Sequence, residues 1–201
     1  MRAKFWFAFL LGVQMPVAAY AAVGEGARPA VSRVAEGGPT LAPFAHVIFC
    51  QKTPGDCVSG GRPNAEAVLD DEGWRSLRRV NDDVNAAIRP TSDRPGPLGD
   101  VWSLAPRRGD CEDYAITKRH RLIALGWPPS ALRLAVARTG RGEGHAVLVA
   151  KTDQGDYVLD NRSRRILRWN ETKLAFLKMQ SGSDPQRWLE VASEDAVSEN
   201  R

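Results

Sequence analysis

The sequence predicts an α+β domain, and the change in its hydrophobic period is the main reason. Helical periodicity is expected at 71–89 and 111–125, whereas from residue 132 onward apolar residues follow the spacing of short strands. Helices followed by a meander of strands are typical of an α+β fold. The chain has 201 residues, 43% of them hydrophobic, which is enough for one domain with a substantial core.

The first 21 residues have the three parts of a signal peptide. A basic start (Arg2 and Lys4) precedes an apolar segment at 5–13 and an A-x-A cleavage motif at 19–21. An uncleaved membrane anchor is the alternative, but Pro16 keeps the apolar run well below the roughly 20 residues that span a bilayer. We therefore expect a periplasmic or secreted protein.

The charge of the chain bears on its partners, and its composition indicates the limits of the domain. The formal net charge of +4 falls to +2 when Arg2 and Lys4 are removed, and no basic block remains, so nucleic-acid binding is not indicated. Residues 22–40 are rich in Gly, Ala, Pro and Arg and are expected to form a flexible lead-in. The domain is expected at 41–191, and 192–201 is a polar tail.

The first predicted helix covers 71–89, where apolar residues recur at helical spacing and Pro90 stops the pattern. Residues 91–109 are rich in Pro and Gly and are expected to form a loop. That loop places Trp102 shortly before Cys111.

The second predicted helix begins at Cys111 and ends near Leu125. Asp110 can cap it and Asp113 can be its N3 partner, a variant of the capping box. Gly126 suits the C-terminal end.

After residue 131 the pattern predicts short strands with one helix among them. The segment 145–151 is almost wholly apolar, as expected for a central strand. A helix is expected at about 171–180. The predicted strands are 132–137, 145–151, 156–160, 164–169 and 187–191.

Three cysteines lie outside the signal peptide. An oxidising compartment favours pairing two of them, and Pro54-Gly55 could turn the chain between Cys50 and Cys57. That disulfide would leave Cys111 as an odd thiol, which in an exported protein can be reactive. Three reduced, buried cysteines are the alternative.

The chain has only three histidines, so there are three candidates for the base that would act on Cys111. His46 is expected in a loop or strand near the cysteine pair. His120 lies nine residues along the Cys111 helix, about 13 Å away, and cannot reach the thiol. His145 opens the most buried strand, next to the loop "GRGEG", and is the best candidate.

Asp160 is the candidate that would orient His145. If the hairpin loop holds an even number of residues, for example 152–155, Lys151 pairs with Asp156. Asp160 then lies opposite Val147 and diagonal to His145 on the same face, within reach of a His–Asp hydrogen bond. A three-residue loop would need a bulge to keep both on one face.

A thiol at a helix N-terminus with an imidazole and a carboxylate is typical of cysteine nucleophiles that attack acyl carbons. The alternative is an unrelated set: one buried Cys, one structural His and one Asp at the end of a strand. Asp110, Glu112 and Asp113 are unusual neighbours because acids raise the pKa of a thiol. A bound Ca²⁺ would cancel their field, although helix capping would account for two of them.

At these residues the sequence resembles the bacterial transglutaminase-like cysteine proteinases. The matching stretches are "RVNDDVNAAIRP", "DVWSLA", "RGDCEDYAITKRHRLIALGWP", "GEGHAVLV" and "GDYVLDN". The resemblance covers about 41–191 and implies a papain-like, transglutaminase-like core. It makes Cys111 the nucleophile, His145 the general base and acid, and Asp160 the orienting carboxylate, with no organic cofactor.

The family includes the LapG-type periplasmic proteases, and the resemblance to them implies further properties. It implies cleavage of a large surface adhesin, dependence on calcium and control by an inner-membrane cyclic-di-GMP receptor. The acids that flank the cysteine would bind calcium, here Asp110 and Glu112, with Asp113 beside them.

We therefore expect an exported cysteine endopeptidase that acts on a protein or peptide substrate. Two alternatives stay open: an acyl transferase that uses the same thioester, and a catalytically silent module that binds an envelope protein. Trp102 could aim its indole N–H at an oxyanion, or it could simply pack in the core. Asn161 could support Asp160 or merely end the strand.

Overall fold

The computed structural model describes residues 31–91 and 100–192. The signal-peptide prediction, residues 22–30 of the predicted lead-in and the tail at 193–201 lie outside these residues. The described part contains α1 (Phe44–Lys52), α2 (Asp71–Ala87), α3 (Cys111–Ala124), and the 3₁₀ turns η1 (Pro54–Cys57), η2 (Pro129–Ala131) and η3 (Trp169–Glu171). Its strands are β1 (Glu36–Thr40), β2 (Arg89–Pro90), β3 (Arg108–Gly109), β4 (Leu132–Arg138), β5 (Gly144–Thr152), β6 (Gly155–Leu159), β7 (Leu167–Arg168), β8 (Ala175–Gln180) and β9 (Trp188–Val191).

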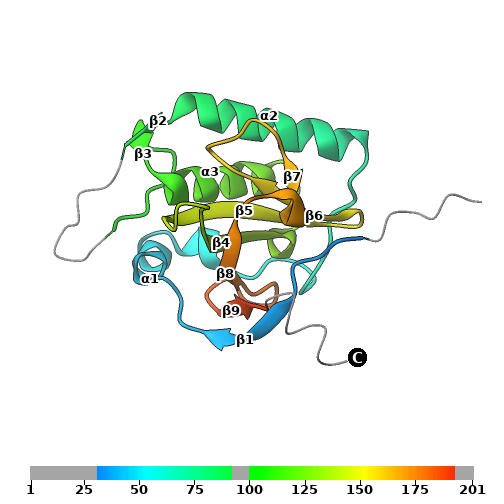
Figure 1. Cartoon of the computed structure of the whole chain (residues 1–201), viewed down its shortest axis with the longest axis horizontal. Coiled ribbons are helices and arrows are strands. Elements are labelled where there is room, and N and C mark those ends of the chain that lie inside the picture. Colours follow the sequence, from blue (N-terminus) through cyan, green and yellow to red (C-terminus); the bar gives the residue numbers. More distant parts are fainter. Residues whose placement is uncertain (1–30, 92–99, 193–201) are drawn as a thin grey trace, which may run out of the picture. The chain divides into compact units, whose positions relative to one another are not determined.

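One seven-stranded sheet organises the fold (Figure 1). Its strand order is β1-β9-β8-β4-β5-β6-β7, and every neighbouring pair is antiparallel. A separate two-stranded parallel pair joins β2 to β3. The predicted α+β class is therefore confirmed.

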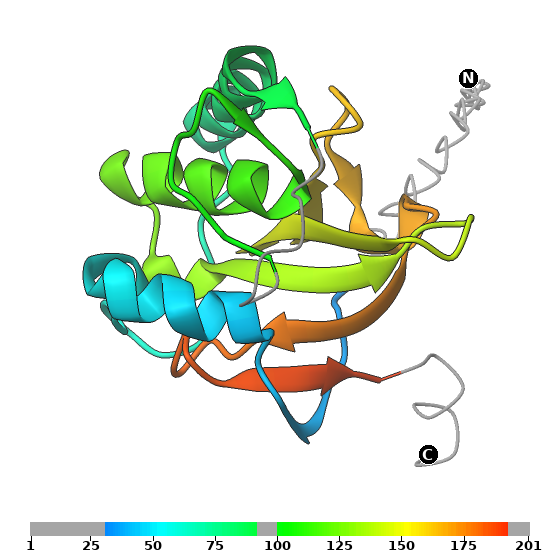
Figure 2. The ribbon, with the colours of Figure 1, turned by 90° about the vertical axis from the view of Figure 1, so that its left-hand side faces the viewer.

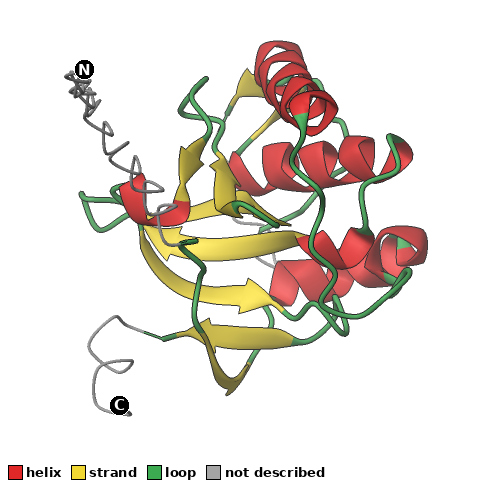
Figure 3. Cartoon of the chain, turned by 90° about the vertical axis from the view of Figure 1, so that its right-hand side faces the viewer, coloured by secondary structure: helices red, strands yellow, loops and turns green. Residues whose placement is uncertain are grey.

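The three α-helices lie on one side of the large sheet (Figure 3). α2 packs on α3 and α3 packs on β5, whereas the start of α1 lies by β4 and β8 (Figure 2). Apolar side chains fill the space between helices and sheet, and a smaller cluster covers the other face. The first group includes Leu77, Val84, Tyr114, Leu122, Leu134 and Leu148, and the second Val34, Val147, Val149, Val158 and Met179.

β5 is buried on both faces because its alternate residues enter the two clusters. This explains why the segment is apolar throughout rather than alternating. Within the described ranges, no helix is both long enough and apolar enough to cross a bilayer.

α3 begins where the sequence predicts, and its first turn is closed by acidic side chains. The capping box between Asp110 and Asp113 is formed, and the Asp110 backbone N–H donates to Asp113 (3.3 Å). Gly109 is required here because a side chain at that position would collide with the Asp113 carboxylate. At the other end, Gly126 has a φ of +92°, as expected for a glycine that ends a helix.

The β5–β6 hairpin has the register that positions its flanking residues. Lys151 pairs with Asp156 and Thr152 with Gly155, which is the even-loop pairing that the sequence predicts. The pairing continues to Leu148 and Leu159. The ends of the two strands therefore carry His145 and Asp160 to the same place.

The predicted helix at about 171–180 is wrong. Residues 175–180 form β8, which is hydrogen-bonded to both β4 and β9, and only 169–171 is helical, as η3. The segment's own pattern is ambiguous, so the pairing partners on either side decide its conformation.

The N-terminal half holds two elements that the sequence did not indicate. β1 at 36–40 pairs with β9, so ordered structure begins within the expected lead-in and before Leu41. Gly and Pro dominate this edge strand, and neither residue signals a strand. α1 places His46 on a helix rather than in a loop or strand.

Candidate active site

Cys111 is the first residue of α3 and the one free cysteine among the described residues. It lies between two cavities, of about 760 Å³ and about 570 Å³. Glycine, proline and charged side chains line the first, including Asp100, Asp110 and Arg162. The second is more apolar and is lined by α1 and β4 residues together with His145. An extended chain crossing from one cavity to the other would pass the thiol.

His145 and Asp160 meet at the edge of the β5–β6 hairpin. Nε2 of His145 lies 2.8 Å from Oδ1 of Asp160. Nδ1 of the same ring is buried and has no hydrogen-bond partner in the described part of the chain. Since His145 and Cys111 line the same cavity, Nδ1 is the nitrogen left to exchange a proton with a group in that cavity.

Asp160 is held as a carboxylate although it is mostly buried. Burial favours its neutral form, but hydrogen bonds from His145 and from the Arg162 backbone N–H (2.8 Å) favour the charged form. The charges of His145 and Lys118 act in the same direction, and the pKa of Asp160 lies below its ordinary value. A charged Asp160 can hold the His145 ring in one orientation.

The Cys111 thiol is not activated in this arrangement. It donates to Oε2 of Glu112 (2.9 Å). Burial, followed by the charge and hydrogen bond of Glu112, raises the pKa of the thiol well above its usual range, while the backbone of Ala146 acts in the opposite sense. The conflict that the sequence indicates, a helix-start cysteine among acids, is therefore present in the structure. Burial raises the pKa of the thiol most, and among the acids Glu112 has the strongest effect.

Three carboxylates converge beside the thiol. Oxygens of Asp100, Asp110 and Glu112 lie within 4.8 Å of one another. Burial, together with a hydrogen bond to Asp100, raises the pKa of Glu112 to about 9. Clustered carboxylates of this kind suit a cation such as Ca²⁺, which prefers oxygen ligands.

Asp113 does not join this group. Its side chain turns inward and accepts from the backbone N–H of Ser103 (2.7 Å) and of Asp110. It therefore anchors the preceding loop to α3. Asp100, which the sequence analysis did not identify, lies with Asp110 and Glu112 instead. Nine residues of loop and strand lie between Asp100 and Asp110, so only the fold brings them together.

Trp102 contacts the acid cluster through its indole N–H, which donates to Asp100 (3.1 Å). That bond occupies the donor that an oxyanion would need. Its ring is buried and lies 5.4 Å from the His46 ring. The packing alternative therefore describes Trp102 better. Asn161 lines the larger of the two cavities, and within the described ranges its buried Oδ1 has no hydrogen-bond partner and no contact shows it supporting Asp160.

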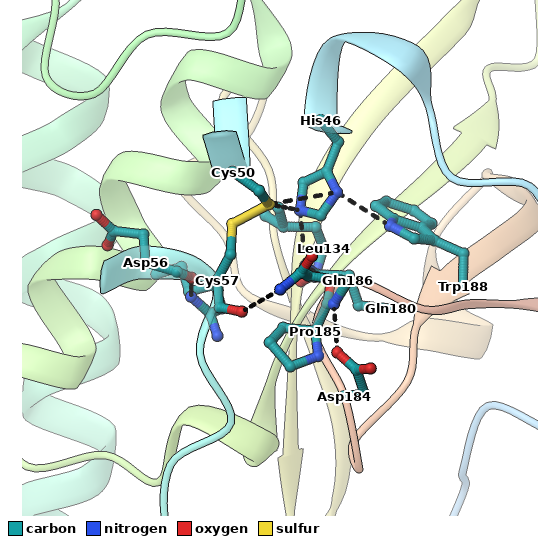
Figure 4. The surroundings of a disulfide bond; sticks show 11 residues. His46, Cys50, Asp56, Cys57, Leu134, Gln180, Asp184, Pro185, Gln186 and Trp188 are labelled. Atoms are coloured by element: carbon teal, nitrogen blue, oxygen red, sulfur yellow. Dashed lines mark hydrogen bonds between the residues drawn. A yellow bond between two sulfur atoms is a disulfide. The ribbon is translucent and has the colours of Figure 1, made fainter. Parts of the chain in front are cut away.

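The Cys50–Cys57 disulfide is present, and His46 lies against it (Figure 4). Nδ1 of His46 accepts from the Trp188 indole (3.3 Å), and Nε2 lies 3.4 Å from the Cys50 sulfur. Burial, and secondarily the charge of Arg119, lowers the pKa of His46 to about 4. His46 is therefore a neutral packing residue and not a base for Cys111.

A family model described as bacterial transglutaminase-like cysteine proteinase matches residues 36–196. Calcium-bound LapG from Legionella pneumophila is similar at 25% identity with a TM-score of 0.50, over 63% of this chain and 78% of that one. A second Legionella pneumophila LapG structure has 26% identity and a TM-score of 0.49, over 63% and 73% of the two chains. None of the curated proteins matches.

Proposed function

Because the chain belongs to the bacterial transglutaminase-like cysteine proteinase family, we propose that it is an exported endopeptidase with the triad Cys111, His145 and Asp160. The observation that carries the triad is the 2.8 Å bond between His145 and Asp160, which leaves Nδ1 of the ring beside the cavity of Cys111. Family membership makes the protein a cysteine peptidase that acts on protein substrates.

The reaction begins when the Cys111 thiol gives its proton to Nδ1 of His145. The sulfur then attacks the peptide carbonyl carbon, and the imidazolium returns the proton to the leaving amine. Water adds to the thioester with His145 as base, and the acid product and the thiol are released. Throughout, Asp160 accepts from Nε2 and stabilises the charged ring, the same role that the aspartate has in serine-protease triads.

Activation requires the thiol to leave Glu112. In the structure the Cys111 thiol is hydrogen-bonded to Oε2 of Glu112, so proton transfer to His145 requires this bond to break. Any partner that binds the Glu112 carboxylate in place of the thiol will therefore favour the reactive thiolate.

We assign Asp100, Asp110 and Glu112 as the residues that would hold Ca²⁺. Their convergence and the raised pKa of Glu112 fit a cation that binds carboxylate oxygens. A bound calcium ion would neutralise the acid cluster and compete for the Glu112 oxygens. The similarity to calcium-bound LapG supports this assignment.

Export is supported by the N-terminal pattern of a signal peptide and by the Cys50–Cys57 disulfide, a feature of oxidising compartments. We propose the periplasm as the site of action. A large surface adhesin as substrate and a cyclic-di-GMP receptor as regulator follow from the LapG resemblance alone, and we retain them as proposals.

The test is a comparison of new N-termini in the envelope proteins of the producing bacterium. An extract of these envelope proteins is incubated with the wild-type protein or with Cys111→Ser, with and without Ca²⁺. New N-termini are then identified by mass spectrometry. An N-terminus that appears only with the wild type identifies substrate and cleavage site. If it appears equally with Cys111→Ser, the proposed nucleophile is excluded.

A biotinylated primary amine in the same incubation separates hydrolysis from acyl transfer. A protease yields new N-termini without amine incorporation, whereas an acyl transferase attaches the amine to acceptor proteins. If neither product forms and Cys111 reacts with iodoacetamide no faster than a free thiol, the protein is a binding module rather than an enzyme.

A further inference from the structure

The cavity of about 570 Å³ beside Cys111 has walls that the proposed reaction does not use. Besides the thiol and His145, it is lined mainly by apolar side chains from α1, β4, β5 and the loop before α3. These apolar residues are Pro43, Phe44, Ala45, Trp102, Val136 and Ala146. Ligand cavities in proteins commonly have such walls, with a few polar groups at the reacting centre. The walls therefore suit an apolar group held next to the thiol.

Phe44 is the most exposed of the large apolar residues in these walls. Its exposed fraction is 60%, whereas Trp102 is 7% exposed and its indole N–H is bonded to Asp100. Single exposed apolar residues are common on protein surfaces and need no function. Phe44 differs from these because it borders a cavity that also contains the proposed nucleophile and base. A ligand that enters the cavity can therefore cover the Phe44 ring.

The apolar surface continues beyond the cavity on both sides of Phe44 in the sequence. Val47 is exposed and lies three residues farther along α1, so the two side chains share one face of the helix. Leu41 is exposed as well, and its carbonyl accepts from Nζ of Lys178 (2.8 Å), another residue that lines the cavity. Phe44 is thus the part of this surface that lies nearest the reacting centre.

α1 is fixed to the rest of the domain on its other side. Phe49 and Cys50 are buried, and the disulfide joins Cys50 to Cys57. The Trp188 indole donates to His46 (3.3 Å). Binding sites on anchored helices hold their geometry better than sites on loops. Phe44 therefore has a defined place in the cavity wall, as a residue that selects substrates requires.

The other cavity beside Cys111 has polar walls. Asp110, Asn161 and Arg162 line it, and none of these three borders the apolar cavity. Cys111 lines both cavities. A peptide that crosses the thiol would therefore have polar surroundings on one side of the scissile bond and apolar surroundings on the α1 side.

We propose that the cavity at α1 is the subsite for a large apolar side chain of the substrate and that Phe44 is the residue that determines this preference. The inference rests on the proposed function, because it takes Cys111 as the reacting centre. A leucine or a similar residue close to the scissile bond would pack against Phe44 and Val136 and displace water from both. A hydroxyl or a charged group would lose its hydrogen bonds to water there without gaining partners from the apolar wall.

The test compares how fast Cys111 reacts with two chloroacetamides that differ in the group on nitrogen. N-isopentyl chloroacetamide carries a leucine-like group, and N-hydroxyethyl chloroacetamide carries a polar one. With each reagent the sulfur displaces chloride and forms a C–S bond, which mass spectrometry detects. The ratio of the two labelling rates is divided by the same ratio for glutathione. This corrected ratio reports selection by the cavity, does not require turnover, and cancels changes in the pKa of the thiol.

The ratio is measured for the wild type, Phe44→Ala and Phe44→Leu in the presence of Ca²⁺. Leu125→Ala is the matched control, because Leu125 is also a large exposed apolar residue but lines a different cavity. We expect the ratio to favour the apolar reagent about tenfold in the wild type and in Leu125→Ala. It should fall to near one in Phe44→Ala and largely recover in Phe44→Leu, which restores an apolar side chain.

Turnover of a peptide spanning the identified cleavage site gives a second readout. Phe44→Ala should raise KM about tenfold with little change in kcat, because packing against Phe44 is made equally in the bound substrate and in the transition state. A fall in kcat with an unchanged KM would contradict a role in substrate selection.

The same corrected ratio in Phe44→Ala as in the wild type overturns the assignment of Phe44, even if both reagents react more slowly. A wild-type ratio near one, or no labelling of Cys111 by either reagent, overturns the apolar subsite. If Phe44→Ala does not fold, Phe44→Gln, which keeps a long side chain but makes it polar, replaces it. The proposed function fails separately: envelope proteins without new N-termini remove the peptidase assignment, whereas the labelling ratio still decides whether the subsite exists.

Discussion

Nε2 of His145 and Oδ1 of Asp160 lie 2.8 Å apart at the edge of the β5–β6 hairpin. Their meeting follows from the hairpin register, which pairs Leu148 with Leu159, so that Asp160 directly follows β6 beside the end of β5 that carries His145. The bond occupies one ring nitrogen and leaves the other for the thiol. It is the geometric basis of the proposed triad and the first feature to test.

Asp160→Asn should preserve the fold and reduce turnover by roughly three to four orders of magnitude, as loss of the orienting aspartate does in serine-protease triads. The amide cannot stabilise the imidazolium and can favour the wrong tautomer. Turnover is measured on a peptide spanning the identified cleavage site, and circular dichroism checks the fold. Near-normal turnover in the folded variant would show that His145 is oriented by another group.

Asp100→Asn and Glu112→Gln should each abolish or strongly weaken Ca²⁺ binding measured by calorimetry. Both substitutions remove a charged oxygen donor while keeping the size of the side chain. Glu143→Gln is the control, because Glu143 is an exposed acid paired with Arg162 across 3.4 Å and is not in the cluster. Absence of binding heat in the wild type would exclude the calcium site itself.

Asp113→Asn should reduce stability without weakening Ca²⁺ binding, because Asp113 is a structural residue and not one of the proposed calcium ligands. The side chain accepts from two backbone N–H groups, and weakening a cap of this kind costs about 1 kcal/mol. Urea unfolding should therefore show a less stable protein, whereas calorimetry should show Ca²⁺ binding close to that of the wild type. Loss of calcium binding with unchanged stability would show that Asp113 is a calcium ligand.

Stability should fall as the pH is lowered because of His46. The unfolded chain takes up a proton on this side chain near pH 6.5, whereas burial in the folded state lowers the pKa to about 4. The stabilisation is complete above pH 6.5 and is lost as the pH falls towards 4, with about 2 kcal/mol lost between pH 7.5 and 5.

Urea unfolding at several pH values measures this effect. His46→Gln should flatten the decline between pH 7.5 and 5. His120→Gln should retain it, because His120 is half exposed and pairs with Asp56 at the surface. An unchanged pH dependence in His46→Gln would mean that His46 does not remain neutral in the folded protein.

Local signals in the sequence are enough to predict the elements that carry the proposed triad. Alternation and helical spacing gave the approximate limits of α2, α3 and β4 to β6, because each segment's own pattern agrees with its final environment. The pairing of Lys151 with Asp156 then placed His145 near Asp160 without further information. These contacts are close in sequence or lie within one hairpin, so short-range rules describe them.

Long-range pairing explains the errors. Residues 175–180 have no decisive pattern of their own and become a strand between β4 and β9. The glycine-rich β1 forms only because β9 offers an edge. Likewise, Asp100 joins Asp110 and Glu112 through the course of a loop that carries no periodic signal.

The sequence by itself determined the helix that begins at Cys111, its acidic cap and the hairpin that carries His145 and Asp160, because these depend on local propensity and register. Only the tertiary structure decided which acids face the thiol, that Asp113 and the Trp102 indole are occupied, and that the Lys118 side chain is buried. Those outcomes depend on where separate elements pack and on which charged groups lose water when they do.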